Sequence, residues 1–282
     1  NTAVGTSALQ SNTTGASNTS LGYQAAYTNT TGSGAVAIGY QALYSAAPAT
    51  SGWSGYTVAI GYQAMYSNSS SYNNTALGYQ TLYYNTTGST CTAVGYQAGY
   101  ANTTGLVTAA GSYAGNSNTT GNIVAFGVSS LRLNTTGVNN VAHGNNSLYS
   151  NTTGNYNTAI GESSLNANTT ASNNTAVGYE AGYSNTTGAN NTAVGYQAGY
   201  SNTTGGVDAF GLGSLYSNTT GDYNTALGHT ALYSNTTASN NTAVGYQASY
   251  LNTTGSQTDS FGYQSLYSNS TGVYNAGFGY KS

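Results

Sequence analysis

A unit of about seventeen residues repeats along the whole chain, and this repeat constrains the fold more than any other feature of the sequence. Each unit contains one glycine, here called the repeat glycine, in a context such as Ala-Val-Gly-Tyr-Gln-Ala. Successive repeat glycines are 17, less often 16 and once 22 residues apart, at positions 5, 22, 39, 61, 78, 95, 111, 127, 144, 161, 178, 195, 211, 228, 245, 262 and 279. A register this strict is expected when each unit forms one coil that stacks on the next.

The two residues before the repeat glycine differ sharply in size. The residue directly before it is usually large and apolar, as in Val4, Ile60, Val94 and Val194, and we call these residues the pre-glycine row. The residue one step earlier is small and is Ala in most units, which gives an Ala row. Because neighbouring residues of a strand face opposite sides, we predict that the pre-glycine row is buried. The flat Ala row would then pack against another chain or against a second strand of its own coil.

The remainder of the unit predicts turns and a second strand. Tyr recurs one residue after the repeat glycine (first Tyr row, for example Tyr79) and five residues after it (second Tyr row, for example Tyr100), and Asn-Thr-Thr-Gly supplies turn chemistry. Gly and β-branched residues are too frequent for a helix. The sequence therefore predicts an all-β, parallel β-solenoid of seventeen coils of about 17 residues, each with two short strands, in a single domain over residues 1–282.

Asn also recurs four residues before the repeat glycine, in ten units, and we call these residues the strand-entry Asn row. Stacked amides can hydrogen-bond from coil to coil. Cys91 takes one of these places, and we interpret it as an inert small residue in the row.

One insertion, residues 45–55, breaks the spacing between Gly39 and Gly61. It contains Pro48 and Trp53, the single Pro and the single Trp of the chain. Loops that interrupt a solenoid usually project from it. Two interpretations stay open: a plain excursion of the chain, or a contact loop built around Pro48 and Trp53.

The near absence of charge excludes several partners. The chain has 2 basic and 5 acidic residues, whereas binding to nucleic acid or to an anionic membrane surface requires clustered Lys and Arg. No apolar run is long enough to span a membrane. A single Cys leaves the compartment undecided. We therefore expect neither nucleic acid nor membrane insertion, and no cofactor.

The titratable residues are too scattered to predict catalysis or metal binding. General acid and base groups must lie within a few ångströms of each other, but Glu162 and Glu180 occupy different positions of neighbouring units, and Asp208 and Asp259 are three units apart. His143 falls in the pre-glycine row and His229 in the first Tyr row. We expect no catalytic residue, no metal ligand and no enzyme activity.

The most specific chemical signal is the sequon Asn-x-Ser/Thr, seven residues after the repeat glycine. A fixed offset in a stacked coil predicts one solvent-facing column of candidate N-glycosylation sites. The same tetrapeptide is also good turn chemistry without any sugar, so both interpretations stay open. The residues, here called the turn Asn row, are Asn12, Asn29, Asn68, Asn85, Asn102, Asn118, Asn134, Asn151, Asn168, Asn185, Asn202, Asn218, Asn235, Asn252 and Asn269.

The unit Asn-Thr-Ala-Val-Gly-x-x-Ala, as in Asn191 to Ala198, resembles the YadA-like head repeats of trimeric autotransporter adhesins. The Gly-Tyr-Gln-Ala-Gly-Tyr segment is similar to repeats of phage tail-fibre proteins. The resemblance implies a left-handed parallel β-roll, usually trimeric, that forms a stalk or head and adheres to surfaces. The adhesin head repeat is typically a few residues shorter than the unit found here.

These observations lead to a structural hypothesis and two alternatives. The main hypothesis is a non-enzymatic, extracellular, repetitive fibre or filament segment on a cell surface or virion, which contacts copies of itself; whether it also carries glycans stays open. The chain starts and ends within a unit, which predicts a segment of a longer protein. The first alternative is an adhesin or tail-fibre module whose Tyr rows bind surface carbohydrate. The second, ice binding, would need a flat Thr-x-Thr ladder, whereas the paired Thr residues here are adjacent and lie in a predicted turn.

Overall fold

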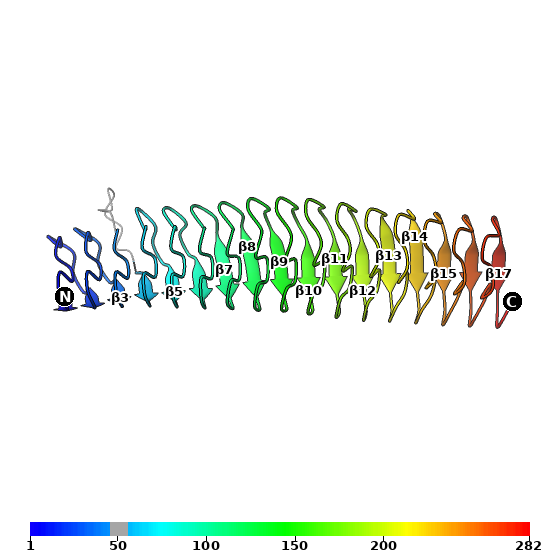
Figure 1. Ribbon diagram of the computed structural model, residues 1–282, viewed down its shortest axis with the longest axis horizontal. Helices are drawn as coiled ribbons and strands as arrows, with labels where there is room; N and C mark the ends of the chain where they lie inside the picture. The colour runs from blue at the N-terminus through cyan, green and yellow to red at the C-terminus, as the bar shows by residue number, and fades with distance from the viewer. Residues whose placement is uncertain (46–55) are drawn as a thin grey trace. The chain divides into compact units, whose positions relative to one another are not determined.

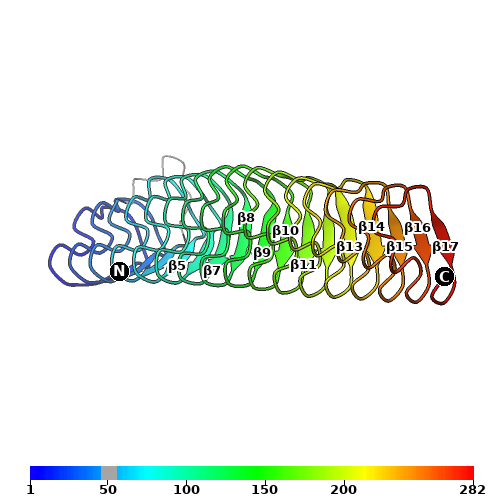
Figure 2. The same ribbon diagram turned by 45° about the vertical axis from the view of Figure 1, so that its right-hand side comes forward.

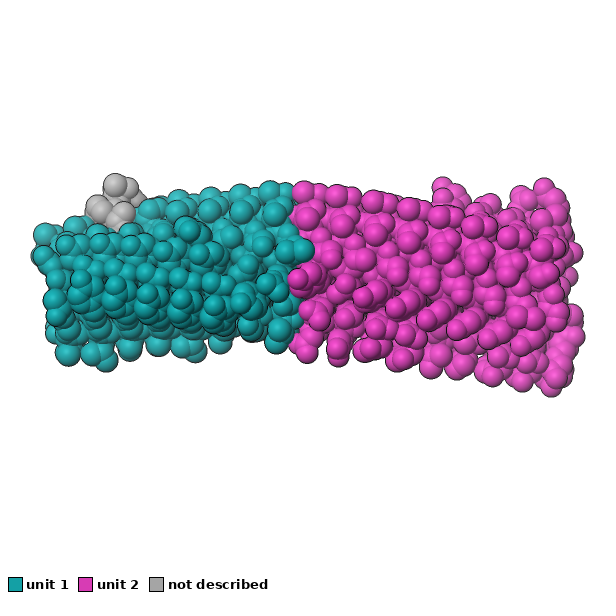
Figure 3. Space-filling view, viewed as in Figure 1, with its two compact units in different colours: residues 1–139 teal, residues 140–282 magenta. Residues whose placement is uncertain are grey.

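The computed structural model describes residues 1–45 and 56–282, and it confirms the all-β, parallel β-solenoid. The described chain divides into two compact units, residues 1–139 and 140–282 (Figure 3). Within each unit the strands stack coil upon coil (Figure 1). Among the described residues there is no helix.

Each coil contributes one strand of three or four residues. Unit 1 contains β1 (Thr2–Val4), β2 (Thr19–Leu21), β3 (Val36–Ile38), β4 (Val58–Ile60), β5 (Thr75–Leu77), β6 (Thr92–Val94), β7 (Val107–Ala110) and β8 (Ile123–Phe126). Unit 2 contains β9 (Asn140–His143), β10 (Thr158–Ile160), β11 (Thr175–Val177), β12 (Thr192–Val194), β13 (Val207–Phe210), β14 (Asn224–Leu227), β15 (Thr242–Val244), β16 (Asp259–Phe261) and β17 (Ala276–Phe278).

Within a unit, each strand pairs in parallel with the strand of the next coil, and equivalent residues lie opposite each other. In β11 and β12, for example, Ala176 faces Ala193 and Val177 faces Val194. The turn segments of successive coils lie side by side on the opposite side of the coil from the strands (Figure 2). Because of this register, residues at equivalent positions of the sequence repeat lie next to each other in successive coils.

The prediction of a second strand in each coil is wrong. After the repeat glycine the described chain forms turns, because the residues two and four positions later have left-handed backbone angles, as in Ser163 (φ 56°) and Leu165 (φ 47°). A strand cannot run through alternating left-handed residues. The turn segments still pair between coils: the Leu165 amide donates to the Ala181 carbonyl at 3.0 Å.

The repeat glycine is required by both conformation and space. At Gly195 the angle φ is +136°, a region that L side chains rarely adopt, and a Cβ atom there would lie 2.6 Å from the Gly211 carbonyl oxygen of the next coil. The repeat glycine lies at a corner of the coil, between the strand and the turn segment. At this corner the backbones of successive coils are too close for any side chain.

The core of each coil is formed by small and medium side chains, and the pre-glycine row is not among them. The Ala row is fully buried in the inner coils, as in Ala176, and so are the Leu or Met residues four positions after the repeat glycine, such as Leu165. These side chains fill the narrow space between the strand and the turn segment. Apolar side chains of this size are the usual source of stabilisation in such a core.

Three coils have 16 residues, and the missing residue is always the same one. In the 17-residue coils a left-handed residue stands directly before the strand-entry position, as Asn190 (φ 61°) does before Asn191. The 16-residue coils lack it, and their four-residue strands β7, β8 and β13 begin with buried Val107, Ile123 and Val207 in place of Asn. Each of these three coils has Gly instead of Leu four positions after its repeat glycine. In two of them the larger side chain lies next to that Gly, because a Cβ atom would be 3.4 Å from Val107 Cγ1 at Gly99 and 2.6 Å from Ile123 Cδ1 at Gly115.

Candidate functional site

The pre-glycine row faces outward, and the prediction that it is buried is therefore wrong. The side chains of Val4, Leu77, Ile160 and Leu227 are between 42% and 56% exposed, and Val94 is 38% exposed. The physical reason lies in the coil itself: the Ala row faces inward because the buried Leu residues of the turn segment already fill the core. Each unit thus presents a row of large apolar side chains to solvent, in register from strand to strand.

The turn Asn row faces inward, which contradicts the prediction of a solvent-facing column. Asn102, Asn185 and Asn202 are 0 to 2% exposed, and only Asn12 and Asn269 in the end coils are partly exposed. The Asn202 side-chain Nδ2 donates to the Gly205 carbonyl at 2.7 Å, and Asn218 Nδ2 donates to Asn202 Oδ1 at 2.8 Å. An N-linked sugar would have to be attached to this same buried nitrogen, so the geometry gives the glycan column no support.

The strand-entry Asn row is confirmed as a coil-to-coil hydrogen-bonded row. In unit 2 the Asn157 backbone amide donates to Asn140 Oδ1 at 2.9 Å, and Asn157 Nδ2 donates to the Ala171 carbonyl at 2.8 Å. Cys91 occupies the predicted place and is fully buried. Burial raises the pKa of its thiol, and a thiol kept protonated is a poor nucleophile.

Both Tyr rows form stacked rings. Along the first Tyr row of unit 1, the ring centroids of Tyr23, Tyr40, Tyr62, Tyr79 and Tyr96 follow one another at 5.0 to 5.3 Å with interplanar angles of 5 to 12°. The second row stacks in the same way, from Tyr27 to Tyr100 in unit 1 and from Tyr183 to Tyr267 in unit 2. Each inner ring thus has a ring against both faces and exposes its edge and hydroxyl.

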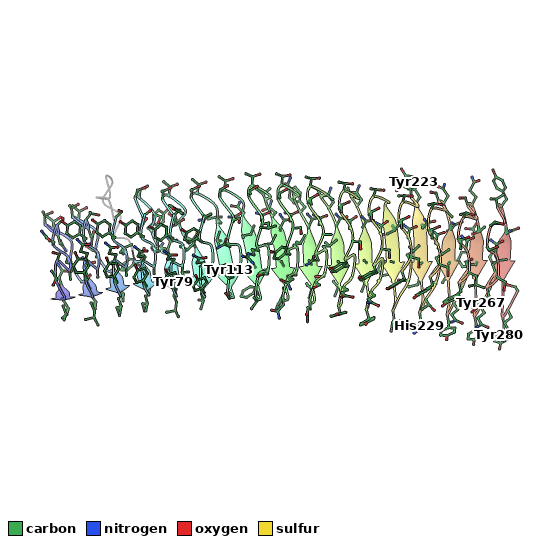
Figure 4. The ribbon with its side chains drawn as sticks, in the orientation of Figure 1. Tyr79, Tyr113, Tyr223, His229, Tyr267 and Tyr280 are labelled. Carbon is green, nitrogen blue, oxygen red and sulfur yellow. The ribbon has the colours of Figure 1, made fainter. Side chains whose placement is uncertain are left out.

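The two histidines take the places predicted for them in the repeat, but the side chain of His143 faces solvent and not the core. His229 continues the first Tyr row, stacked on Tyr246 with centroids 5.3 Å apart (Figure 4). His143 lies in the pre-glycine row and is exposed, where the sequence predicted a buried residue.

The carboxylates lie in different surroundings: Asp208 and Asp222 line a hollow of unit 2, and Glu180 lies in a turn segment. Glu180 accepts a hydrogen bond from Gln197 Nε2 at 2.7 Å. A hydrogen bond between Tyr179 and Glu180, followed by the negative charge of that carboxylate, raises the pKa of the Tyr179 phenol. Among residues 1–45 and 56–282 there is no group of three or more His, Cys, Asp and Glu side chains placed to hold a metal ion. The candidate contact residues Pro48 and Trp53 lie outside the described residues.

A hollow in unit 2 is a feature that sequence reasoning missed. It has a volume of about 420 Å³ and lies beside β13 and β14, lined by Asn190, Gly206, Asp208, Asp222 and Tyr223 among others. The signal that could have found it is the shortened coil between Gly195 and Gly211, with two glycines at its turn and two of the five acidic residues nearby.

No protein-family model, curated protein or solved structure matches this chain. In the part of the chain that the structure describes, no helix is long and apolar enough to cross a bilayer.

Proposed function

We propose that this chain is a structural segment of an extracellular fibre, in which copies of the chain associate side by side through the pre-glycine row. The observation that carries the proposal is the exposure of this row on the strand face of each unit. Contiguous exposed apolar surface is typical of protein interaction sites, and burial of each such side chain contributes to association.

The spacing of the row favours a second copy of this chain as the partner. The apolar side chains recur once per coil, at the spacing of neighbouring parallel strands. A partner can make the same contact with each of these side chains only if its own side chains recur at the same interval. A second copy of the chain has this interval because it has the same sequence. Low net charge adds little repulsion between copies, since the chain carries a formal charge of −3.

Sugar recognition by the Tyr rows has weaker support. A sugar ring stacks on the open face of an aromatic ring, but the inner rings of each row already stack on their neighbours at about 5 Å. The Tyr rows are better suited to stabilise the coil stack, where aromatic pairs contribute about 0.5 to 1.5 kcal/mol each.

The experiment is a measurement of oligomeric state by sedimentation velocity and light scattering. The unmodified chain is expected to form a defined oligomer or filament, and the double variant Ile160→Lys, Leu227→Lys is expected to be monomeric. The matched control is the double variant Thr170→Lys, Thr237→Lys, because both residues are exposed in turn segments outside the row. Circular dichroism verifies that each variant is folded. A monomeric unmodified chain at high concentration, or equal dissociation by the control, would refute the proposal.

A further inference from the structure

The hollow beside β13 and β14 is a consequence of one shortened coil. Between Gly195 and Gly211 the coil has 16 residues and lacks the left-handed residue that precedes other strands, so Gly206 is followed directly by Val207. Gly206 has no positive φ, and a Cβ atom there would be 3.5 Å from Asp222 Oδ1 and 3.7 Å from the Ala189 carbonyl oxygen. The backbone therefore does not require glycine at this position, and a side chain here would project toward the hollow.

Unit 1 contains an equivalent coil in which the same place has a side chain, half of which is exposed. Between Gly95 and Gly111 the residue corresponding to Gly206 is Leu106, and its amide donates to Asn122 Oδ1 at 3.1 Å, as the Gly206 amide does to Asp222 Oδ1 at 2.5 Å. The residues equivalent to Asp208 and Asp222 are Thr108 and Asn122, which are neutral. The hollow in unit 2 thus differs from its counterpart by a missing side chain and two added carboxylates.

Hydrogen bonds between successive coils fix the walls of the hollow. Besides the contact from the Gly206 amide to Asp222, the Tyr223 amide donates to the Gly206 carbonyl at 2.8 Å, and the Asp222 amide donates to Ser239 Oγ at 3.0 Å. The Asp222 carboxylate and the backbone at Tyr223 are therefore held in place before any ligand arrives, which reduces the entropy lost on binding.

The groups on the walls match one class of ligand. Tyr223 is 76% exposed and is not stacked in a Tyr row. The carboxylates of Asp208 and Asp222 accept hydrogen bonds, and the Asn190 amide can both donate and accept. A sugar ring has an apolar C–H face that packs on an aromatic ring and hydroxyl groups that donate to carboxylates. A volume of 420 Å³ is within the range of small-molecule sites and is large for a bare ion.

We propose that this hollow binds a neutral saccharide unit, with Tyr223 against the sugar ring and with Asp208, Asp222 and Asn190 bonded to its hydroxyl groups. The site lies in unit 2 at the edge opposite His229 and Tyr280 (Figure 4). Neither Tyr223 nor Asp208 belongs to the pre-glycine row, but Asp208 shares the outward face of β13 with Phe210 of that row, so binding is measured at a protein concentration where the chain is monomeric.

Saturation-transfer NMR on the full chain provides the test, with methyl glucoside, methyl mannoside, methyl galactoside and N-acetylglucosamine as probes. At least one of these probes is expected to bind at one site per chain, with little dependence on salt. Gly206→Leu places the natural residue of the unit 1 coil in the hollow and is expected to weaken binding at least tenfold. Tyr223→Ala is expected to have a similar effect. Its matched control is Tyr274→Ala, because Tyr274 takes the same turn position and is 75% exposed.

Three results would overturn the proposal. The first is the absence of binding by all four saccharides. The second is equal loss of binding in Tyr223→Ala and Tyr274→Ala, or unchanged binding in a folded Gly206→Leu variant. The third is binding of spermidine or calcium chloride without any saccharide, weakened by salt as expected for a charged ligand. Sedimentation of the same variants separates these outcomes from a failure of chain association.

Discussion

Replacement of Leu165 by Ala tests which side chains form the core. Leu165 is 1% exposed, and it packs over Gly182 of the next coil, where an added Cβ atom would lie 3.0 Å from Leu165 Cδ2. No side chain at Gly182 can move into the space that Leu165 leaves. Loss of the buried methyl groups and the remaining cavity together are expected to lower the free energy of unfolding by about 4 kcal/mol, in the upper half of the range for such changes.

The matched comparison is Val177→Ala on β11, the strand that follows Leu165 in the chain. Val177 belongs to the outward pre-glycine row and is only partly buried, so its truncation is expected to cost about 1 kcal/mol or less in the isolated chain. Urea unfolding at low protein concentration gives both values, and amide hydrogen exchange locates the loss, because damage in a stacked repeat stays near the altered coil. A cost for Val177→Ala equal to or above that for Leu165→Ala would show that the assignment of the two faces is wrong.

Three further predictions concern the corner, the Asn row and the Tyr rows. Gly195→Ala is expected to lower the free energy of unfolding by about 3 kcal/mol because of its positive φ and the close carbonyl, whereas Gly206→Ala, which has room, is expected to change it little in thermal melts. For the chain produced in a glycosylating host and purified in its folded state, peptide-level mass spectrometry is expected to find no sugar on the buried residues of the turn Asn row, such as Asn102 and Asn185, and sugar there would contradict this geometry. Burial, a hydrogen bond with Tyr84 that favours the protonated Tyr100 phenol, and the neighbouring phenols raise the pKa of Tyr100 to about 12. Stability from this group is therefore present below pH 10 and is lost as the pH rises from 10 toward 12; phenolate absorbance should show the late titration, and Tyr84→Phe should lower that pKa.

The parallel solenoid and the positions of its rows could be predicted from the sequence because periodicity fixes them. A constant offset from the repeat glycine places Asn140 over Asn157 and Tyr200 over Tyr216, whatever the detailed path of the chain. Hydrogen-bonded and stacked rows then follow from the chemistry of the side chain at each place.

The facing of the rows could not be predicted in the same way. Alternation along a strand determines that the Ala row and the pre-glycine row face opposite sides, but it does not say which side is the core. The turn segment decides which row faces the core, because left-handed residues such as Leu165 place their side chains inside the coil. Left-handed Leu is rare, so the sequence offers no ordinary signal for it, and the expected second strand was wrong for the same reason. The inward turn Asn row follows from the same backbone path.

The stability of a single coil does not explain why the outward pre-glycine row is apolar. Threonine or serine at these positions would satisfy the fold equally well, because the core is filled by the Ala row and by residues such as Leu165. Exposed apolar rows add little stability to a single chain and favour aggregation. Large apolar residues nevertheless stand at nearly every pre-glycine position from Val4 to Phe278, with Ala110 and His143 as the departures. A single chain does not need apolar side chains in this row, so an interaction that buries them is the most direct explanation. A partner with the same repeat interval can contact the row in each coil.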